Sequence, residues 1–449
     1  MALVRGLSVT RRGFIRTAGV GTGAALVTAC GAAGQPAVKE RVPVNISVWT
    51  WTNVINMPVW ERAVTRFNEL HAKDKLTVTL THKPDQTVYW TTLTAEHAAG
   101  TPPDVIYGSP LETQDIASKG MLKDISAVIK RDKFDINDIN PPAQVGYMFD
   151  GKIWALACWN DTRILSINKS AFQAAGIPLP PQTVDGAGWT VDDFVNAARK
   201  LNDVPNNKYA FVPDGITGAV VRLPWLFGGY FWNDEKVPTR SAFGSPEYVK
   251  GLEWARDLQN AHRVLPPRTW VNQFTGGHDR MFPAGQMPIA YAAYKHITAG
   301  WADIKDFEWS VAPLPRGTRR MHHVSPQAFA AEALSKNPDE AWTVVRQYST
   351  GEPNEIMATV SSMPSYKKTD IYKVAAVPSE RRWMVKLLYD AMNTGKPLVP
   401  HPNVKLEMTQ AMDAAVNDML DDKISAAEAA KTGADKVNAV FDRFGIKPK

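Results

Sequence analysis

Tryptophan residues are the first candidates for chemistry in this sequence, because 15 of its 449 residues are Trp. Flat aromatic rings pack on the apolar faces of a ligand, and carboxylate or amide groups beside them bond its hydroxyl groups. Trp51 and Asn53 follow an alternating apolar stretch that predicts a strand, and ligands bind beyond the carboxyl ends of strands in open parallel sheets. Trp225 and Trp232 flank a glycine pair that includes Gly229, and glycine lets backbone approach a ligand closely. These five residues are therefore candidates for ligand binding.

Signatures of catalysis and of metal binding are missing from the sequence. It contains no H-E-x-x-H sequence, no phosphate-binding Gly-Lys-Ser/Thr loop and no G-x-S-x-G elbow. His322 and His323 are adjacent, but neighbours in a strand point to opposite faces and no nearby Cys or acid completes a ligand set. We therefore expect no metal, no cofactor and no enzymatic activity, and we keep His322 as a possible hydrogen-bond donor to a ligand.

The N-terminus carries two export features in order. Residues 10–16 read TRRGFIR and precede a Gly- and Ala-rich stretch too short to span a membrane, which resembles a twin-arginine export signal. That stretch ends at VTACG, residues 27–31, which resembles a lipobox with Cys30 as the lipid-modified cysteine. We expect a signal at 1–29, a lipidated Cys30 with a flexible tether to residue 43, and a position outside the cytoplasmic membrane, which the protein contacts through its lipid anchor alone.

Cysteine count and charge agree with export of a folded chain. The sequence has two cysteines, so Cys158 is left without a disulfide partner and is expected to be a buried apolar residue. The formal charge of +6 falls to +2 without residues 1–29, which contain four arginines and no acid. The remaining Lys and Arg are spread along the chain, so no nucleic-acid partner is expected.

Strands and helices alternate along the body of the chain, which favours an α/β sheet. Strands are predicted at 44–51, 76–80, 105–107, 152–157 and 164–167. Helices are predicted at 87–99, 170–175, 191–201, 246–261 and 407–420, with Thr190 as an N-cap.

Several phrases, in order over residues 44–370, resemble the family 1 extracellular solute-binding proteins, which include the maltose-binding components of ABC importers. They are AAGTPPDVI at 98–106, GMLKDI at 120–125, GKIWAL at 151–156, LSINKSAFQAAGI at 165–177, GWTVDDF at 188–194, FPAGQM at 282–287, APLP at 312–315 and KNPDEAW at 336–342.

The resemblance implies two α/β lobes joined by a hinge, with a ligand cleft between them. One lobe would comprise 44–158 plus 326–361, and the other 163–321 plus 365–449. It also implies site residues in the cleft, and an ABC permease as partner of a monomeric receptor for a small solute. Those residues are Trp159 and Asp161 at the first crossing, Ser109 and Glu112 after the 105–107 strand, a stacking Trp225 or Trp232, and Tyr294 near a strand end.

The ligand stays open at this stage. Acids and aromatics favour a neutral carbohydrate, whereas an anionic ligand would need Arg or Lys such as Arg163 or Lys295 in the cleft. Two alternatives without a transport role also stay open. An exported glycosidase is one, because 45 acidic residues always offer some carboxylate pair. A surface adhesion lipoprotein is the other.

Overall fold

The computed structural model describes residues 41–447, except 53, 235–237, 275–276, 302, 360–361, 375–376 and 398–404. The predicted export signal, Cys30 and most of the predicted tether lie outside the described residues. No helix in the described part of the chain is long and apolar enough to cross a membrane.

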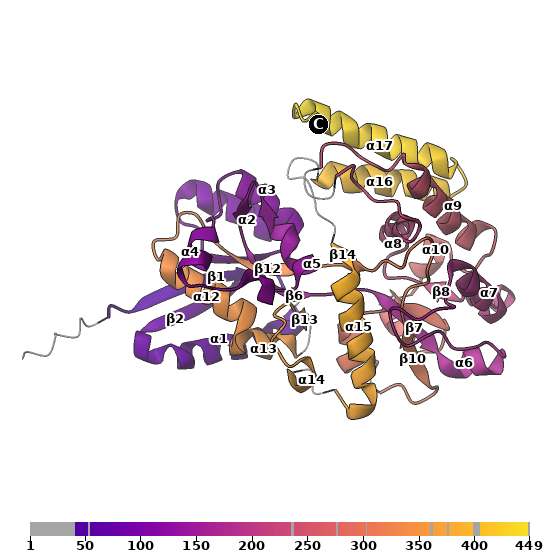
Figure 1. Ribbon diagram of the computed structural model, residues 1–449, viewed down its shortest axis with the longest axis horizontal. Helices are drawn as coiled ribbons and strands as arrows, with labels where there is room; N and C mark the ends of the chain where they lie inside the picture. Colours follow the sequence, from indigo (N-terminus) through magenta and orange to yellow (C-terminus); the bar gives the residue numbers. More distant parts are fainter. Residues whose placement is uncertain are drawn as a thin grey trace, which may run out of the picture. The chain divides into compact units, whose positions relative to one another are not determined.

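The first lobe is built on a six-stranded sheet of order β13-β6-β12-β3-β1-β2 (Figure 1). Its strands are β1 (Val44–Thr50), β2 (Leu76–His82), β3 (Val105–Gly108), β6 (Leu156–Asn160), β12 (Gln327–Ala331) and β13 (Met363–Pro364). β1 is parallel to β2 and β3, and β12 runs antiparallel between β3 and β6. The carboxyl ends of β1, β3 and β6 therefore meet at one edge of this sheet.

Helices cover both faces of the first sheet. Its alternating and fully apolar strands require this, because Ile46 and Val48 of β1 and all of β3 are buried. One face carries α1 (Met57–Leu70), α12 (Pro338–Thr350) and α13 (Glu352–Ala358); the other carries α2 (Gln86–Ala99), α3 (Pro110–Ser118) and α4 (Ser126–Arg131) (Figure 1).

The strand predicted at 152–157 is two strands in the structure. β5 (Lys152–Ile153) forms a hairpin with β4 (Met148–Phe149), and β6 begins only at Leu156. The turn between β4 and β5 contains Asp150 and Gly151, both at positive φ. The prediction was wrong here because the apolar run continues through the break between a local hairpin and the central sheet.

The second lobe is built on a four-stranded sheet of order β10-β7-β9-β8. Its strands are β7 (Ile164–Asn168), β8 (Phe211–Val212), β9 (Ile289–Ala292) and β10 (Trp309–Ala312). Successive residues enter opposite cores, as strand geometry requires: Leu165 and Tyr291 join one core, whereas Ile164 and Ala292 join the other. This sheet is therefore buried on both faces.

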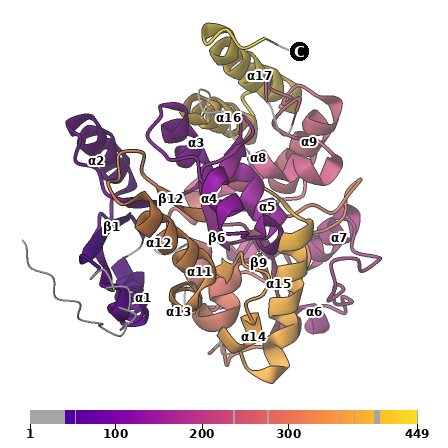
Figure 2. The ribbon, with the colours of Figure 1, turned by 60° about the vertical axis from the view of Figure 1, so that its left-hand side comes forward.

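Helices of the second lobe follow the same two cores. Those of the first core are α7 (Val191–Leu201), α8 (Ile216–Arg222), α9 (Pro246–Asn260), α16 (Lys405–Leu420) and α17 (Ala426–Arg443). Those of the second core are α10 (Arg268–Val271), α11 (Gly277–Met281), α14 (Ile371–Val374) and α15 (Arg382–Thr394). α6 (Lys169–Ala174) follows β7. Figure 2 shows α16 and α17 side by side as a yellow pair, as Figure 1 does.

The chain passes between the two sheets at residues 161–163, again between β10 and β12, and a third time after β13. The first two crossings are hydrogen-bonded to each other: the Asp161 amide donates to the Ser325 carbonyl at 3.2 Å, and the Ser325 amide returns a bond of 2.8 Å to Asp161. The Thr162 hydroxyl also donates to the His323 carbonyl at 2.7 Å. A short strand in the second crossing, β11 (His323–Val324), pairs with β14 (Lys396–Pro397). α5 (Pro141–Gln144), in the first lobe, contacts β14 and α15.

Candidate functional site

Functional candidates gather at the carboxyl edge of the first sheet. Trp51 follows β1, Ser109 follows β3, and Asp161 follows β6. Because β1, β3 and β6 run in the same direction, these residues lie at the same edge, where ligands of open α/β sheets bind.

Aromatic rings contact one another at this edge and form an aromatic surface in which Trp51 is half-buried and Tyr107 and Trp159 are buried. The Trp51 ring lies 5.5 Å from that of Tyr107, and Tyr107 lies 5.7 Å from Trp159 in edge-to-face contact. Trp159 is buried and packs on Trp60, whereas Trp51 is half-buried. The indole N–H groups of Trp51 and Trp159 have no acceptor among the described residues. Trp51 is thus the ring of this group best placed to meet a ligand, with Trp159 behind it.

Tyr107 is held in this aromatic surface by Tyr89. The Tyr89 hydroxyl accepts from the Tyr107 amide at 3.1 Å and donates to the Tyr107 carbonyl at 3.0 Å. Burial raises the pKa of Tyr89 well above its ordinary value, so the hydroxyl keeps its proton and the donor role. The sequence analysis missed both tyrosines, since an aromatic residue in an apolar stretch is indistinguishable from core.

Ser109 and Glu112 are hydrogen-bonded to each other. Ser109 is the N-cap residue of α3, and its hydroxyl donates to the Glu112 carboxylate in the first turn of that helix. Gln86 of α2 also lies at 3.5 Å from a Glu112 oxygen. The pair therefore stabilises the start of α3, beside the aromatic surface.

Asp161 belongs to a charged network with Arg163 and Asp214. One Asp161 oxygen accepts from the Thr162 amide at 2.9 Å, and the other lies 2.7 Å from Arg163 Nη1. Arg163 Nε donates to Asp214, which follows β8. β7 begins where β8 and β9 end, because it is antiparallel to β9, so Arg163 and Asp214 meet at one edge of the second sheet.

Electrostatics of this network follow from burial and pairing. Burial would lower the pKa of Arg163, but the charges of Asp161 and Asp214 outweigh it and raise that pKa. Burial would likewise raise the pKa of Asp214, and the Arg163 charge holds it below its usual range. Arg163 and Asp214 are therefore both ionised at neutral pH. The sequence analysis missed Asp214; its one signal was the Pro213-Asp214-Gly215 turn sequence.

Residues predicted in the second lobe have mainly internal contacts. A side chain at Gly229 would clash with the Tyr248 backbone at 2.5 Å, so its close approach is to α9. Trp232 packs edge-to-face on Phe441 of α17 and is buried. Tyr294 is fully buried, and its hydroxyl has no partner among the described residues. The core of the second lobe therefore contains Gly229, Trp232 and Tyr294.

His322 serves the backbone of the second crossing. Its Nε2 accepts from the Leu314 amide at 3.3 Å, and burial lowers its pKa to about 3. The neutral ring therefore contacts protein rather than open space. Asn53 lies outside the described residues.

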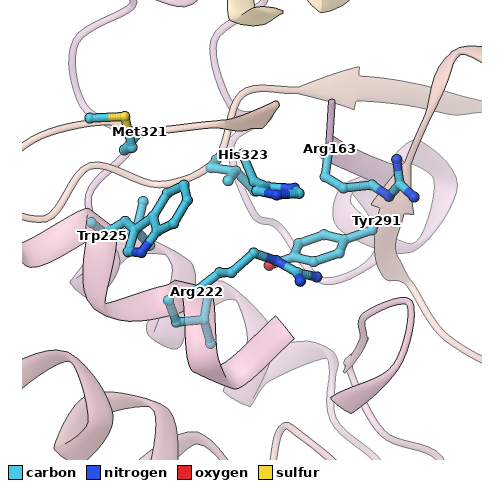
Figure 3. A pocket seen from close by; sticks show the side chains of 9 residues that line it. Arg163, Arg222, Trp225, Tyr291, Met321 and His323 are labelled. Atoms are coloured by element: carbon cyan, nitrogen blue, oxygen red, sulfur yellow. The ribbon is translucent and has the colours of Figure 1, made fainter. Parts of the chain in front are cut away.

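Trp225 lines a small cavity in the second lobe, with Arg163, Arg222, Tyr291 and His323 (Figure 3). The cavity measures about 20 Å³, and Leu223, Leu226, Leu314 and Met321 complete its wall. Trp225 packs against Tyr230, at 4.9 Å, and against His323, at 5.7 Å. Its indole N–H has no acceptor among the described residues. Of the aromatic candidates in this lobe, Trp225 is the one beside an open space.

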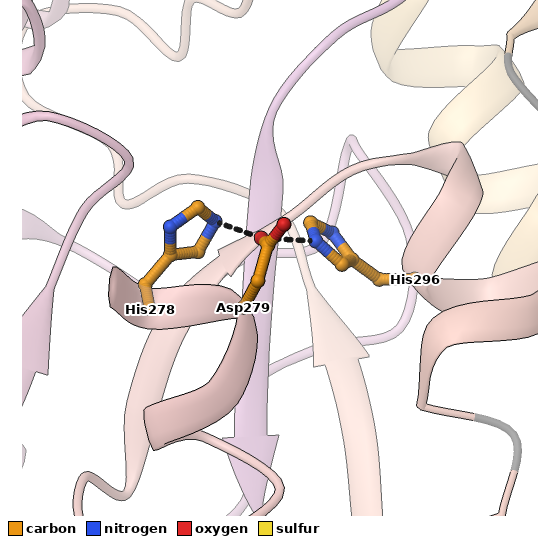
Figure 4. Close-up of side chains that lie close together, drawn as sticks. All are labelled: His278, Asp279 and His296. Atoms are coloured by element: carbon orange, nitrogen blue, oxygen red, sulfur yellow. Dashed lines mark hydrogen bonds and ion pairs between the residues drawn. The ribbon is translucent and has the colours of Figure 1, made fainter. Parts of the chain in front are cut away.

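A second titratable cluster consists of His278, Asp279 and His296, whose ligand-type atoms lie within 4.8 Å of one another (Figure 4). His296 Nδ1 accepts from the Ala293 amide at 2.8 Å, which leaves the proton on Nε2, 2.8 Å from Asp279 Oδ1. A metal-binding His normally donates from its second ring nitrogen, which is the opposite polarity. The cluster is therefore arranged to hold a proton between His296 and Asp279 rather than a cation.

Two lobes, each a sheet covered by helices and connected by crossing segments, define a two-lobed α/β fold of the periplasmic binding-protein type, as predicted. The chain belongs to the bacterial extracellular solute-binding protein family, which residues 51–350 match. This confirms the family expected from the ordered sequence phrases.

Solved structures and a curated relative agree with this assignment. An ABC substrate-binding protein from Listeria monocytogenes in complex with cycloalternan has a TM-score of 0.75 at 19% identity, over 90% of this chain and all of the other. Maltose-bound MalE3 of T. maritima has a TM-score of 0.70 at 21% identity, over 88% and 99%. At these identities the likeness shows the fold alone.

The curated relative is an uncharacterized lipoprotein in the oleD 5' region of Streptomyces antibioticus. It is 23% identical over 252 residues, which make up 54% of this chain and 53% of that protein. The chain thus spans about half the length of the curated relative it matches.

Proposed function

We propose that this protein is the substrate-binding component of an ABC importer and that it captures a carbohydrate between its two lobes. The observation that carries this proposal is the half-buried Trp51 ring, which lies against the buried Tyr107 ring of the aromatic surface, at the same sheet edge as the charged crossing residue Asp161. Rings accept the C–H faces of a sugar, and the charged groups pair with its hydroxyls. The sugar ligands named for the solved relatives, cycloalternan and maltose, support the same class.

The proposed mechanism is closure about the crossing segments. Lobe 1 would comprise 44–158 plus 326–361, and lobe 2 would comprise 163–321 plus 365–449. A ligand that contacts both lobes binds the closed arrangement better and shifts the population toward it. The ligand contacts we propose are Trp51, Trp159 and Asp161 at the first-lobe edge and the crossing, and Trp225 in lobe 2. Permease subunits would bind the closed form of a monomeric receptor.

Anchoring through Cys30 is part of the proposal. The RR pair and the sequence VTACG support export in a folded state followed by lipid attachment outside the cytoplasmic membrane. Cys30→Ser should release the protein from the membrane fraction and abolish labelling by a radioactive fatty acid. Labelling that survives this change would contradict the anchor.

Calorimetric titration of the purified protein with a panel of neutral and charged mono- and oligosaccharides tests the function. Saturable binding with unchanged sugar afterwards is expected. Recovery of hydrolysed sugar would favour the exported glycosidase, and no binding by any sugar would favour the adhesion lipoprotein.

A further inference from the structure

Arg222 is the charged group in the second lobe that the proposed function does not use. It ends α8, where one arginine interrupts the apolar sequence of residues 219–227, AVVRLPWLF. The side chain reaches the cavity of about 20 Å³ and lies against Tyr291 (Figure 3). Burial is deep enough to lower the pKa of the guanidinium from its ordinary value. The cavity has room for about one water-sized group, such as a single polar arm of a larger ligand.

No hydrogen bond or ion pair joins the Arg222 guanidinium to any other described residue. Asp214 and Asp413 attract it through space, yet neither forms an ion pair with it in the described structure. Arg163, in the wall of the same cavity, does form ion pairs, because it lies between Asp161 and Asp214 and both contact it. Asp161 and one oxygen of Asp214 are thus paired with Arg163, whereas Arg222 forms no ion pair with any described acid.

A second donor borders the same cavity. The Trp225 indole N–H is buried and has no acceptor among the described residues. Leu223, Leu226, Leu314 and Met321 supply only apolar side chains to the wall. A buried donor without an acceptor, here the Trp225 indole N–H, is costly until an acceptor enters. A guanidinium such as that of Arg222 prefers a planar carboxylate, which accepts two parallel N–H bonds.

We infer that the captured carbohydrate is an acidic sugar, that one oxygen of its carboxylate enters this cavity, and that Arg222 and the Trp225 indole N–H donate to the carboxylate. The inference rests on the proposed function and narrows its substrate class. Uronic acids are the sugars that carry a carboxylate as a single compact arm on the ring. A neutral sugar would bring no anion into contact with the guanidinium of Arg222.

The test is calorimetric titration with matched ligands. Glucuronate and galacturonate, and their di- and trisaccharides, are compared with the same sugars as primary amides, which keep the shape and remove the charge. Neutral glucose, galactose and malto-oligosaccharides complete the panel. We expect acid forms to bind about tenfold to a hundredfold more tightly than their amides, the range for a hydrogen bond to a charged group.

Variants assign the preference to Arg222. Arg222→Gln should reduce binding of the acid form by the same factor and leave the amide unchanged. Arg222→Lys keeps the charge but lacks the planar guanidinium with two parallel donors. Its affinity for the acid form should therefore lie between those of the unmodified protein and Arg222→Gln. Arg256→Gln is the control, because Arg256 is an exposed arginine of lobe 2 that pairs with Asp422. Arg222→Gln loses only the through-space attraction of Asp214 and Asp413, so it should still unfold in one cooperative transition and keep the circular dichroism spectrum of the unmodified protein, which shows that it is folded.

The outcomes separate the two proposals. Neutral sugars that bind as tightly as acid forms, or an acid preference that survives Arg222→Gln, would overturn the acidic-sugar inference and leave the receptor intact. Absence of binding by every sugar, neutral or acidic, would overturn the receptor proposal and the inference with it.

Discussion

Replacing Arg163 by Met should destabilise the second lobe in a pH-dependent way. Arg163 makes two charge-assisted contacts, with Asp161 and with Asp214, and the three side chains are 25%, 20% and 19% exposed. A hydrogen bond to a charged group contributes about 1.5–3 kcal/mol, and partial exposure places each contact at the lower end, so the loss is about 2–4 kcal/mol. The loss arises largely because both carboxylates are left without a cation.

The pH dependence follows from Asp214. In the unmodified protein its lowered pKa contributes stability above the unfolded value, about 3.9, and this stability is lost as pH falls through the folded pKa. Without Arg163, burial raises the pKa of Asp214 above that of the unfolded chain. Arg163→Met is therefore destabilised least when Asp214 is protonated. The difference in free energy of unfolding between the unmodified protein and the variant, the stability gap, should narrow from pH 7 to pH 4.

Urea unfolding at pH 4, 5 and 7 measures this gap. With a slope of about 3 kcal/mol/M, the midpoint at pH 7 should fall by roughly 1 M in Arg163→Met. Adding Asp214→Asn should restore part of the loss at pH 7 and flatten its pH dependence. Arg256→Met, at an exposed pair with Asp422, should change the free energy of unfolding by no more than about 1 kcal/mol. A gap of equal size at all three pH values would refute the reasoning.

Three shorter predictions concern other parts of the molecule. Trp51→Ala should weaken sugar binding by about tenfold to a hundredfold with little change in melting temperature, because the ring is only half-buried; calorimetry that finds unchanged affinity would remove Trp51 from the site. Cys158 should resist a thiol reagent at pH 8 in the native protein and react at once in guanidinium, since burial raises the pKa of its thiol; rapid native labelling would contradict this. Zinc at micromolar concentration should not raise the melting temperature, because the His296 ring already accepts the Ala293 amide; a clear rise that His278→Ala abolishes would show a metal site.

Local patterns explain why several elements could be predicted. The alternation of 44–51 corresponds to β1, and Thr190 caps α7 through a capping box with Asp193. Gly100 ends α2 at a φ of +77°, a conformation that glycine adopts without strain. Each of these signals lies within a few residues of the feature it predicts. β8, with two residues, is too short to show any period, and the edge of the second sheet was missed for that reason.

The candidate site depends instead on contacts between distant residues, which no local pattern reveals. The family resemblance implied Asp161 as a carboxylate near the cleft, but it did not indicate the ion pair of Arg163 with Asp214, 51 residues away. The ion pairs of Arg163 change the ligand that we expect, because an acid paired with arginine is no longer evidence for a neutral ligand. Arg222 forms no ion pair in the described structure, and the sequence alone indicates only that it is the charged end of an apolar helix. The ligand charge therefore follows from how these side chains pair in the folded protein rather than from how many acids and bases the chain contains.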